Sequence, residues 1–300
     1  MAMIKCVKNH SEILELIKYQ ELVEIARRYK SAKNYFYSRY SGINSLNKLK
    51  SYKKEIRDVL IKQETCEVFG LQARQWKIAL DEAISGIKSN WSNTKNRIKI
   101  AIARNQNLSD AERHYLNYIL KADELLYFVL TRQEFKETEG LLKIDIKKER
   151  KSYLLNLLRR CVRKYKNKIP YTNKATNFQI DANMYKYIYK EDGLYINIMS
   201  LKPRQMLLVK LKGHYRYSGN LTVIINSNQS IKIHRGLSVE EKSLDETYLN
   251  IVGIDKGYTK MLSCSNGIEY GTELGKLLFK RTEELKTKNA KRNQLYALAK

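Results

Sequence analysis

The sequence predicts an α+β protein of several domains: a helical bundle, a small β-barrel and the start of a further α/β domain, in that order. Apolar residues recur at a spacing of about 3.6 up to Pro170, whereas they alternate with polar residues after it. A second group of short strands then precedes a basic helix. The 300 residues, of which 43% are hydrophobic, suffice to bury cores of this kind.

The helical region is expected to cover residues 11–169, after a possible first barrel strand at 1–10. Its first helix is expected to run from a cap at Ser11 to about Tyr40. The apolar residues expected to form the buried face of that helix are Ile13, Leu16, Ile17, Val23 and Ala26.

Two further helices have clearer signals. Ser109 and Glu112 have the spacing of a capping box, and the apolar face that follows them consists of Leu116, Ile119 and Leu120. The last helix of the region is expected to end near Lys168, because Pro170 cannot continue it. Its apolar stripe is Leu154, Leu157, Leu158, Cys161 and Tyr165.

The strand region is expected at 170–247. "YKYIYKEDGLYINI" is typical of a hairpin that turns at Glu191-Asp192-Gly193. "MLLVKLK", "LTVIIN" and "IKIHR" are further short strands separated by Gly, Asn and Ser, which favours a small barrel. The remaining domain, 248–300, should contain strands at "YLNIVGID", "KMLSCS" and "IEYG" and a basic helix from about Thr272.

The charge of the chain indicates a polyanionic partner. Lys and Arg number 57 against 31 Asp and Glu, a formal net charge of +26. Two stretches, 83–109 and 193–239, contain no acidic residue, and basic residues also predominate in 141–170. The candidate contacts to nucleic acid in the acid-free stretches are Lys88, Lys95, Arg97, Lys202, Arg204, Lys210, Lys212 and Arg216.

Aromatic residues lie among these cations and could stack on bases. Trp91 lies in the first acid-free stretch, and "KSAKNYFYSRY" places Tyr35, Tyr37 and Tyr40 beside Lys33 and Arg39. Each aromatic residue could equally belong to a core, and each Lys-rich helix face could simply be solvated. The agreement of three clusters favours nucleic-acid binding.

Other function classes find little support. The four cysteines are far apart, so neither a zinc site nor a disulfide framework is expected, and a reducing compartment fits. No apolar run approaches the length of a bilayer span, and the first residues lack the apolar core of a signal peptide. A cytoplasmic, nucleoid-associated protein that binds no membrane is expected.

Asp255 is the strongest candidate for chemistry. It is expected at the end of a buried strand between Gly253, which permits close approach, and Gly257, which lets the backbone turn away. A carboxylate held there suits Mg²⁺, and two such ions can assist phosphodiester hydrolysis. A strand-end turn that merely favours Asp remains the alternative.

The segment "IVGIDKGYTKMLSCSNGIEYG" resembles the first RuvC motif of TnpB proteins, the transposon-encoded relatives of type V CRISPR effectors. The strand region resembles the wedge barrel of that family, and "GLQARQWKIALDEAISGIKSNW" resembles its recognition helices. The resemblance implies an RNase H-like (RuvC) domain, a guide RNA, double-stranded target DNA, and Mg²⁺-dependent cleavage with Asp255 as catalytic metal ligand. It implies no obligate protein partner. It adds Arg74, Lys77, Lys280 and Arg281 to the expected nucleic-acid contacts.

The resemblance covers most of the chain, but only the Gly-Ile-Asp-x-Gly block is a sharp motif. The family begins with a Tyr-Pro strand that is absent here, and its remaining acids and zinc module should follow residue 300. The chain is therefore expected to be the N-terminal part of a longer nuclease, inactive by itself. Two alternatives stay open: a non-catalytic RNA or DNA binder and, less favoured, an actin-like ATPase or sugar kinase, which "GIDKGYTK" also resembles.

Overall fold

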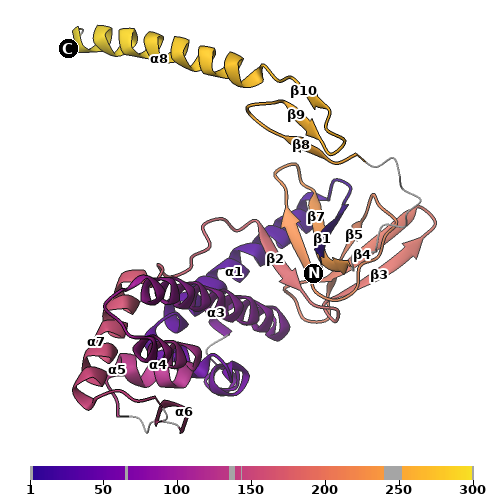
Figure 1. Cartoon of the computed structure of the whole chain (residues 1–300). Helices are drawn as coiled ribbons and strands as arrows, with labels where there is room; N and C mark the ends of the chain where they lie inside the picture. Colours follow the sequence, from indigo (N-terminus) through magenta and orange to yellow (C-terminus); the bar gives the residue numbers. More distant parts are fainter. Residues whose placement is uncertain (1–2, 65–66, 135–138, 143, 240–251, 299–300) are drawn as a thin grey trace. The chain divides into compact units, whose positions relative to one another are not determined.

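The computed structural model describes residues 3–64, 67–134, 139–142, 144–239 and 252–298 (Figure 1). The chain forms two compact units: Ile4–Val239, and Glu240–Lys300 together with Met1–Met3. The protein is a mixed α/β protein with several small antiparallel sheets. Among the described residues, no helix combines the length and apolarity that a bilayer span requires.

Helices dominate the first part of the larger unit, as predicted. They are α1 (Leu16–Tyr40), α2 (Asp58–Lys62), α3 (Ala73–Arg104), α4 (Asp110–Lys121), α5 (Asp123–Thr131), α6 (Glu139–Leu142) and α7 (Lys148–Tyr165). The two longest, α1 and α3, pack against each other, with Tyr29 and Phe36 of α1 fully buried. Between α1 and α3 the described residues form short helical segments: the 3-10 helices Ile43–Lys48 and Glu67–Phe69, the π-helix Lys53–Arg57, and α2.

The predicted start of α1 was wrong, and of its predicted core face only Ala26 is buried. Ser11 forms a β-bridge with Leu211, and its backbone N–H donates to the carbonyl of Ile231 (2.9 Å); the helix begins later, at Leu16. Ile13 and Ile17 are exposed, at 76% and 78%. The buried face of α1 consists instead of Leu22, Ile25, Ala26, Tyr29, Ala32, Lys33, Phe36 and Tyr37.

The other helix signals were confirmed. Ser109 and Glu112 form the capping box of α4, with the Glu112 backbone N–H donating to Ser109 Oγ (3.3 Å) and Ser109 N–H donating to the Glu112 carboxylate (2.8 Å). The predicted face Leu116, Ile119 and Leu120 is buried. In α7, Leu154 and Leu158 are buried, whereas the rest of the predicted stripe is half-buried at the edge of a groove described below.

Seven strands of the larger unit form two sheets. They are β1 (Met3–His10), β2 (Asn177–Ile180), β3 (Tyr185–Lys190), β4 (Gly193–Met199), β5 (Met206–Lys210), β6 (Leu221–Ile225) and β7 (Ile231–Val239). One sheet has the order β1-β7-β6-β2 and the other β3-β4-β5. The two meet at one corner, where Ser11, just after β1, bridges to Leu211, just after β5. The expected hairpin turns at Glu191 and Asp192, with Lys190 opposite Gly193.

The predicted barrel is not closed within the described part of the chain, because no ladder joins β2 to β3. The strand β2 packs against α1 and α3 instead, and the ring centroids of Phe178 and Tyr29 lie 6.4 Å apart. Inward residues still alternate along the strands as a half-buried sheet requires, for example Leu194, Ile196 and Ile198 on β4.

The smaller unit contains β8 (Ile254–Lys256), β9 (Leu262–Cys264), β10 (Glu269–Tyr270) and α8 (Leu274–Leu298). The strands form an antiparallel sheet of order β10-β9-β8. The expected helix from about Thr272 is confirmed as α8. The expected strand "YLNIVGID" lies partly outside the described residues, which resume at Val252.

Candidate nucleic-acid interface

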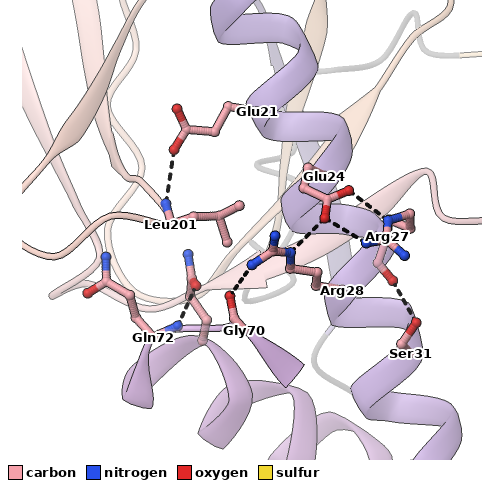
Figure 2. Close-up of polar contacts among 9 residues, drawn as sticks. Glu21, Glu24, Arg27, Arg28, Ser31, Gly70, Gln72 and Leu201 are labelled. Carbon is pink, nitrogen blue, oxygen red and sulfur yellow. Dashed lines mark hydrogen bonds and ion pairs between the residues drawn. The ribbon is translucent and has the colours of Figure 1, made fainter. Parts of the chain in front are cut away.

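The start of α3 is tied to the turn between β4 and β5. Gln72 caps α3, and its side-chain amide donates to the carbonyls of Ser200 (2.6 Å) and Lys202 (3.0 Å). Glu21 of α1 accepts from the backbone N–H of Leu201 (3.0 Å), as Figure 2 shows, and from the Ser200 hydroxyl. The cations Lys202 and Arg204 are therefore exposed on a turn whose backbone is held by two helices.

The other side of this junction is fixed by Arg28 (Figure 2). Its guanidinium donates to Gly70 O (2.6 Å) and to the carboxylate of Glu24 (2.6 Å). Gly70 has φ +60°, a conformation that favours glycine, and a Cβ there would lie 2.4 Å from Arg28 Nη1, so a larger residue would displace this guanidinium. Hydrogen bonds from Arg27 and Arg28 lower the pKa of Glu24 to about 2.

Three of the predicted nucleic-acid contacts in the larger unit have carboxylate partners within the protein. Arg74 pairs with Asp181 (2.9 Å), Lys95 pairs with Asp123, and Lys210 pairs with Asp192 (3.2 Å) and Glu12 (3.4 Å). These cations join neighbouring elements, and an added phosphate would have to compete with their carboxylates. Their primary role in this structure is to fix the surface on which the unpaired cations lie.

The aromatic residues of the helical region belong mostly to the core. Trp91 is buried, and Lys166 Nζ lies 5.0 Å from its ring centroid on the outer side. Tyr37 is buried, and the Tyr35 ring packs edge-on against Phe69, with centroids 5.3 Å apart. For Trp91 and Tyr37 the structure therefore confirms the core role, and their buried rings cannot stack on a base.

A basic groove of about 650 Å³ lies between α3 and α7. Its cationic lining consists of Arg97, Arg104, Arg160 and Lys164, and its remaining lining of Ile100, Ala101, Asn105, Leu157, Cys161 and Tyr165. The helical repeat produces this arrangement: positions 97, 101 and 104 of α3 share one face, and so do 157, 160 and 164 of α7. Burial raises the pKa of the Cys161 thiol, which keeps it neutral beside these cations.

The cations of this groove are available to a ligand. Arg97 donates to the Asn167 side-chain oxygen (2.6 Å), a neutral partner that orients the guanidinium and leaves its charge uncompensated. Arg104, Arg160 and Lys164 pair with no carboxylate among the described residues. Arg160 and Lys164 lie in the basic stretch 141–170 but were not among the predicted contacts. Their spacing of four residues, which puts both on one helix face, is the sequence signal for them.

The remaining predicted contacts are spread over the surface. Lys77 lies 5.7 Å from the ring centroid of Trp76, and Lys88 lies 5.0 Å from that of Tyr52. Lys212 and Arg216 are exposed after β5. On α8 of the smaller unit, Lys280 is exposed, and the neighbouring Arg281 pairs with Glu284 (2.9 Å).

Asp255 lies on an exposed strand, not at the end of a buried one. It is the middle residue of β8, and Ile254 before it is exposed. In register, Asp255 lies opposite Ser263, and so does Glu269 from the other side, which places both carboxylates on one face of the sheet. Glu269 is paired with Lys260.

The two glycines beside Asp255 have separate structural roles. Gly253 exchanges hydrogen bonds with Ser265, whose backbone N–H donates to Gly253 O (2.7 Å) and whose Oγ accepts from Gly253 N–H (2.9 Å). At Gly257 a Cβ would lie 3.0 Å from the carbonyl of Lys260, so the turn into β9 favours glycine.

The described residues do not by themselves fit a two-metal site. Among them, no group of three or more His, Cys, Asp or Glu side chains is placed to hold an ion. One uncompensated carboxylate cannot offset two divalent charges. A metal ion bound at Asp255 would therefore need further ligands from other residues.

Among known proteins, no protein-family model matches the chain, and a search of curated proteins gives no match.

Proposed function

We propose that this chain binds nucleic acid and is the recognition part of an RNA-guided DNA-binding protein of the TnpB type. The observation that carries the proposal is the groove between α3 and α7, where unpaired cations flank an apolar floor. Such a groove suits a phosphodiester backbone, because the cations neutralise phosphates while the floor contacts sugars.

The strand region supports the same proposal. Its acid-free surface carries Lys202, Arg204, Lys212 and Arg216, none of which pairs with a carboxylate among the described residues. A protein guided by RNA holds the guide and the target through their backbones, while base pairing reads the sequence. Several separate cationic surfaces, each on a rigid support, fit this mode better than a single sequence-reading helix does.

Cleavage is the less supported part of the proposal. The resemblance of the Asp255 segment to a RuvC motif implies a Mg²⁺ ligand there, and among the described residues one edge of β8 has no partner strand. The second candidate is a binder without catalysis, which needs no group of metal ligands beside Asp255; none of three or more is present among the described residues. We expect the 300-residue chain to bind nucleic acid but not to cut DNA in millimolar Mg²⁺.

The test is the salt dependence of binding to structured RNA. The logarithm of the binding constant should fall by roughly 0.7 to 0.9 per neutralised phosphate for each tenfold rise in salt, so several contacts give a steep line. RNA recovered from the protein purified without nuclease treatment should contain discrete species. A slope shallower than about −3 would mean that the cations form only solvated faces and would overturn the proposal.

A further inference from the structure

The segment Gly213–Gly219 joins β5 to β6 without regular secondary structure, yet tyrosines of β3 hold its backbone. The Tyr189 hydroxyl donates to the carbonyl of His214 (3.2 Å), and the Tyr187 hydroxyl accepts from the Tyr217 N–H (3.3 Å). The Tyr185 hydroxyl lies 2.9 Å from Gly219 O and 3.0 Å from Tyr217 O. These tyrosines occupy every second position of β3 and so lie on one face of it, where their hydroxyls contact successive parts of the segment.

A buried asparagine holds the other side of this segment. Asn9 of β1 is 4% exposed; its Oδ1 accepts from the N–H of Gly213 (3.1 Å), and its Nδ2 donates to the carbonyl of Tyr215 (3.3 Å). A Cβ at Gly213 would lie 2.7 Å from Asn9 Oδ1, so this close approach requires glycine. The backbone of the segment is thus fixed by strands from both sheets.

The groups that this ordered segment presents to solvent are aromatic and cationic. Tyr215 is 75% exposed. The guanidinium carbon of Arg216 lies 4.0 Å from the ring centroid of Tyr189, a cation–π contact that keeps this cation at that ring. Lys212 is exposed just before the segment, and no acidic residue occurs between Gly193 and Val239.

This combination has the properties of a prearranged binding surface. Ordering a loop costs conformational entropy, and a ligand that meets an already ordered loop avoids that cost. An aromatic ring and a guanidinium plane both stack on nucleobases, and adjacent cations contact phosphate. Bases inside a duplex already stack on each other, so only an unpaired base can offer its face to Tyr215.

We propose that Tyr215 and Arg216 form a stacking site for an unpaired nucleobase. The Arg216 guanidinium is held over the Tyr189 ring, and Lys212 contacts a phosphate of the same strand. This inference rests on the proposed function, since its ligand is nucleic acid, and it assigns the strand region a single-stranded segment. Stacking reads a π-face that all bases share, so the site is tolerant of sequence.

The test compares Tyr215→Ala with Tyr215→Phe in the full chain. The probes are unstructured oligonucleotides of about 12 residues, oligo-uridine RNA and oligo-thymidine DNA, and a blunt-ended duplex of two separate strands, which has no unpaired base. Fluorescence anisotropy gives the affinity at several salt concentrations. Tyr171→Ala is the matched control, because Tyr171 is a similarly exposed tyrosine, at 67%, outside the strands and outside this segment.

The expected result is a loss of about tenfold in single-strand affinity for Tyr215→Ala at every salt concentration, with an unchanged salt slope. Tyr215→Phe and Tyr171→Ala should bind as the unaltered protein does. Lys212→Gln should instead make the slope shallower by roughly 0.7, the value for one single-strand phosphate. Equal losses on RNA and DNA would show recognition of the base alone, and a loss on RNA only would assign the strand to RNA.

Several results would overturn the inference. These are an affinity of Tyr215→Ala within about twofold of the unaltered protein, failure of phenylalanine to restore binding, and an equal loss on the blunt-ended duplex. Failure of the broader proposal is distinguishable, because the unaltered protein would then bind all three probes without a steep salt dependence. A steep slope with an ineffective Tyr215→Ala would remove only the stacking site.

Discussion

Replacing three cations of the groove between α3 and α7 should weaken binding by an amount that the structure defines. We choose Arg104, Arg160 and Lys164, each changed to Gln, and leave Arg97 in place because it also bonds to Asn167. None of the three pairs with a carboxylate among the described residues, so their removal leaves no buried charge without a partner. The fold should therefore be unaffected.

The expected magnitude follows from counterion release. Each phosphate contact contributes about 0.7 to 0.9 to the slope of log affinity against log salt, so losing three contacts should make the slope shallower by roughly 2 to 3. If the lines for the variant and the unaltered protein converge at about 1 M salt, the affinity at about 0.1 M should fall by roughly 100- to 500-fold. The measurement is anisotropy with a structured RNA over this salt range.

A matched control removes the same charge elsewhere. Lys18, Arg27 and Arg57 are paired with Glu15, Glu24 and Asp58 on the surface of the same unit. Changing these three to Gln alters the net charge equally but touches no groove. If this control flattens the slope as much as the groove variant does, net charge governs binding, and the assignment of the groove is refuted. Thermal unfolding should confirm that both variants keep the stability of the parent.

Three further outcomes are expected. Glu82→Leu should lower the free energy of unfolding, measured by urea denaturation, by roughly 2 to 4 kcal/mol, because the buried ammonium of Lys33 (2.6 Å from Glu82) and the Tyr29 hydroxyl (2.8 Å) lose their partner. Adding Lys33→Met should recover part of the loss. A loss under about 1 kcal/mol would contradict this reasoning. Ser109→Ala should cost about 1 kcal/mol and lower Tm by roughly 2 to 4 °C, whereas Ser109→Asp should keep the cap and restore Tm. The pKa of Glu24 is about 2 in the folded chain, so its stabilising contribution should be complete above about pH 4.5 and should disappear as the pH falls toward 2. Because Glu24 and its arginine partners are partly exposed, that contribution should stay below about 1 kcal/mol. A difference in the free energy of unfolding between Glu24→Gln and the parent that persists at about pH 2 would contradict this prediction.

Features specified by neighbouring residues could be predicted from the sequence. The capping box at Ser109, the hairpin at Glu191-Asp192 and the helix after Thr272 each depend on a few consecutive side chains, and all three are present. The strands after Pro170 were predicted for the same reason, since alternation needs only local information.

Features specified by distant partners could not be predicted in this way. Ile13, Leu16 and Ile17 have helical spacing, yet the buried residues of α1 begin with Leu22 and Ile25, because the packing partner selects the face. The groove brings Arg104 beside Arg160 only through the packing of α7 on α3. Closure of the barrel also depends on distant pairing: β2 and β3 are close in sequence, yet no ladder joins them, and β2 packs against α1 and α3.

The sheet β10-β9-β8 has a further consequence for handling the protein. The strand β8 has backbone donors and acceptors on its outer edge with no partner strand among the described residues. An uncovered edge is a template for another strand, from the same chain or from a second molecule, and concentrated solutions should self-associate through it. Any strand that adds there lies about 4.8 Å from β8, so whatever residue it places opposite Asp255 becomes the immediate neighbour of that carboxylate.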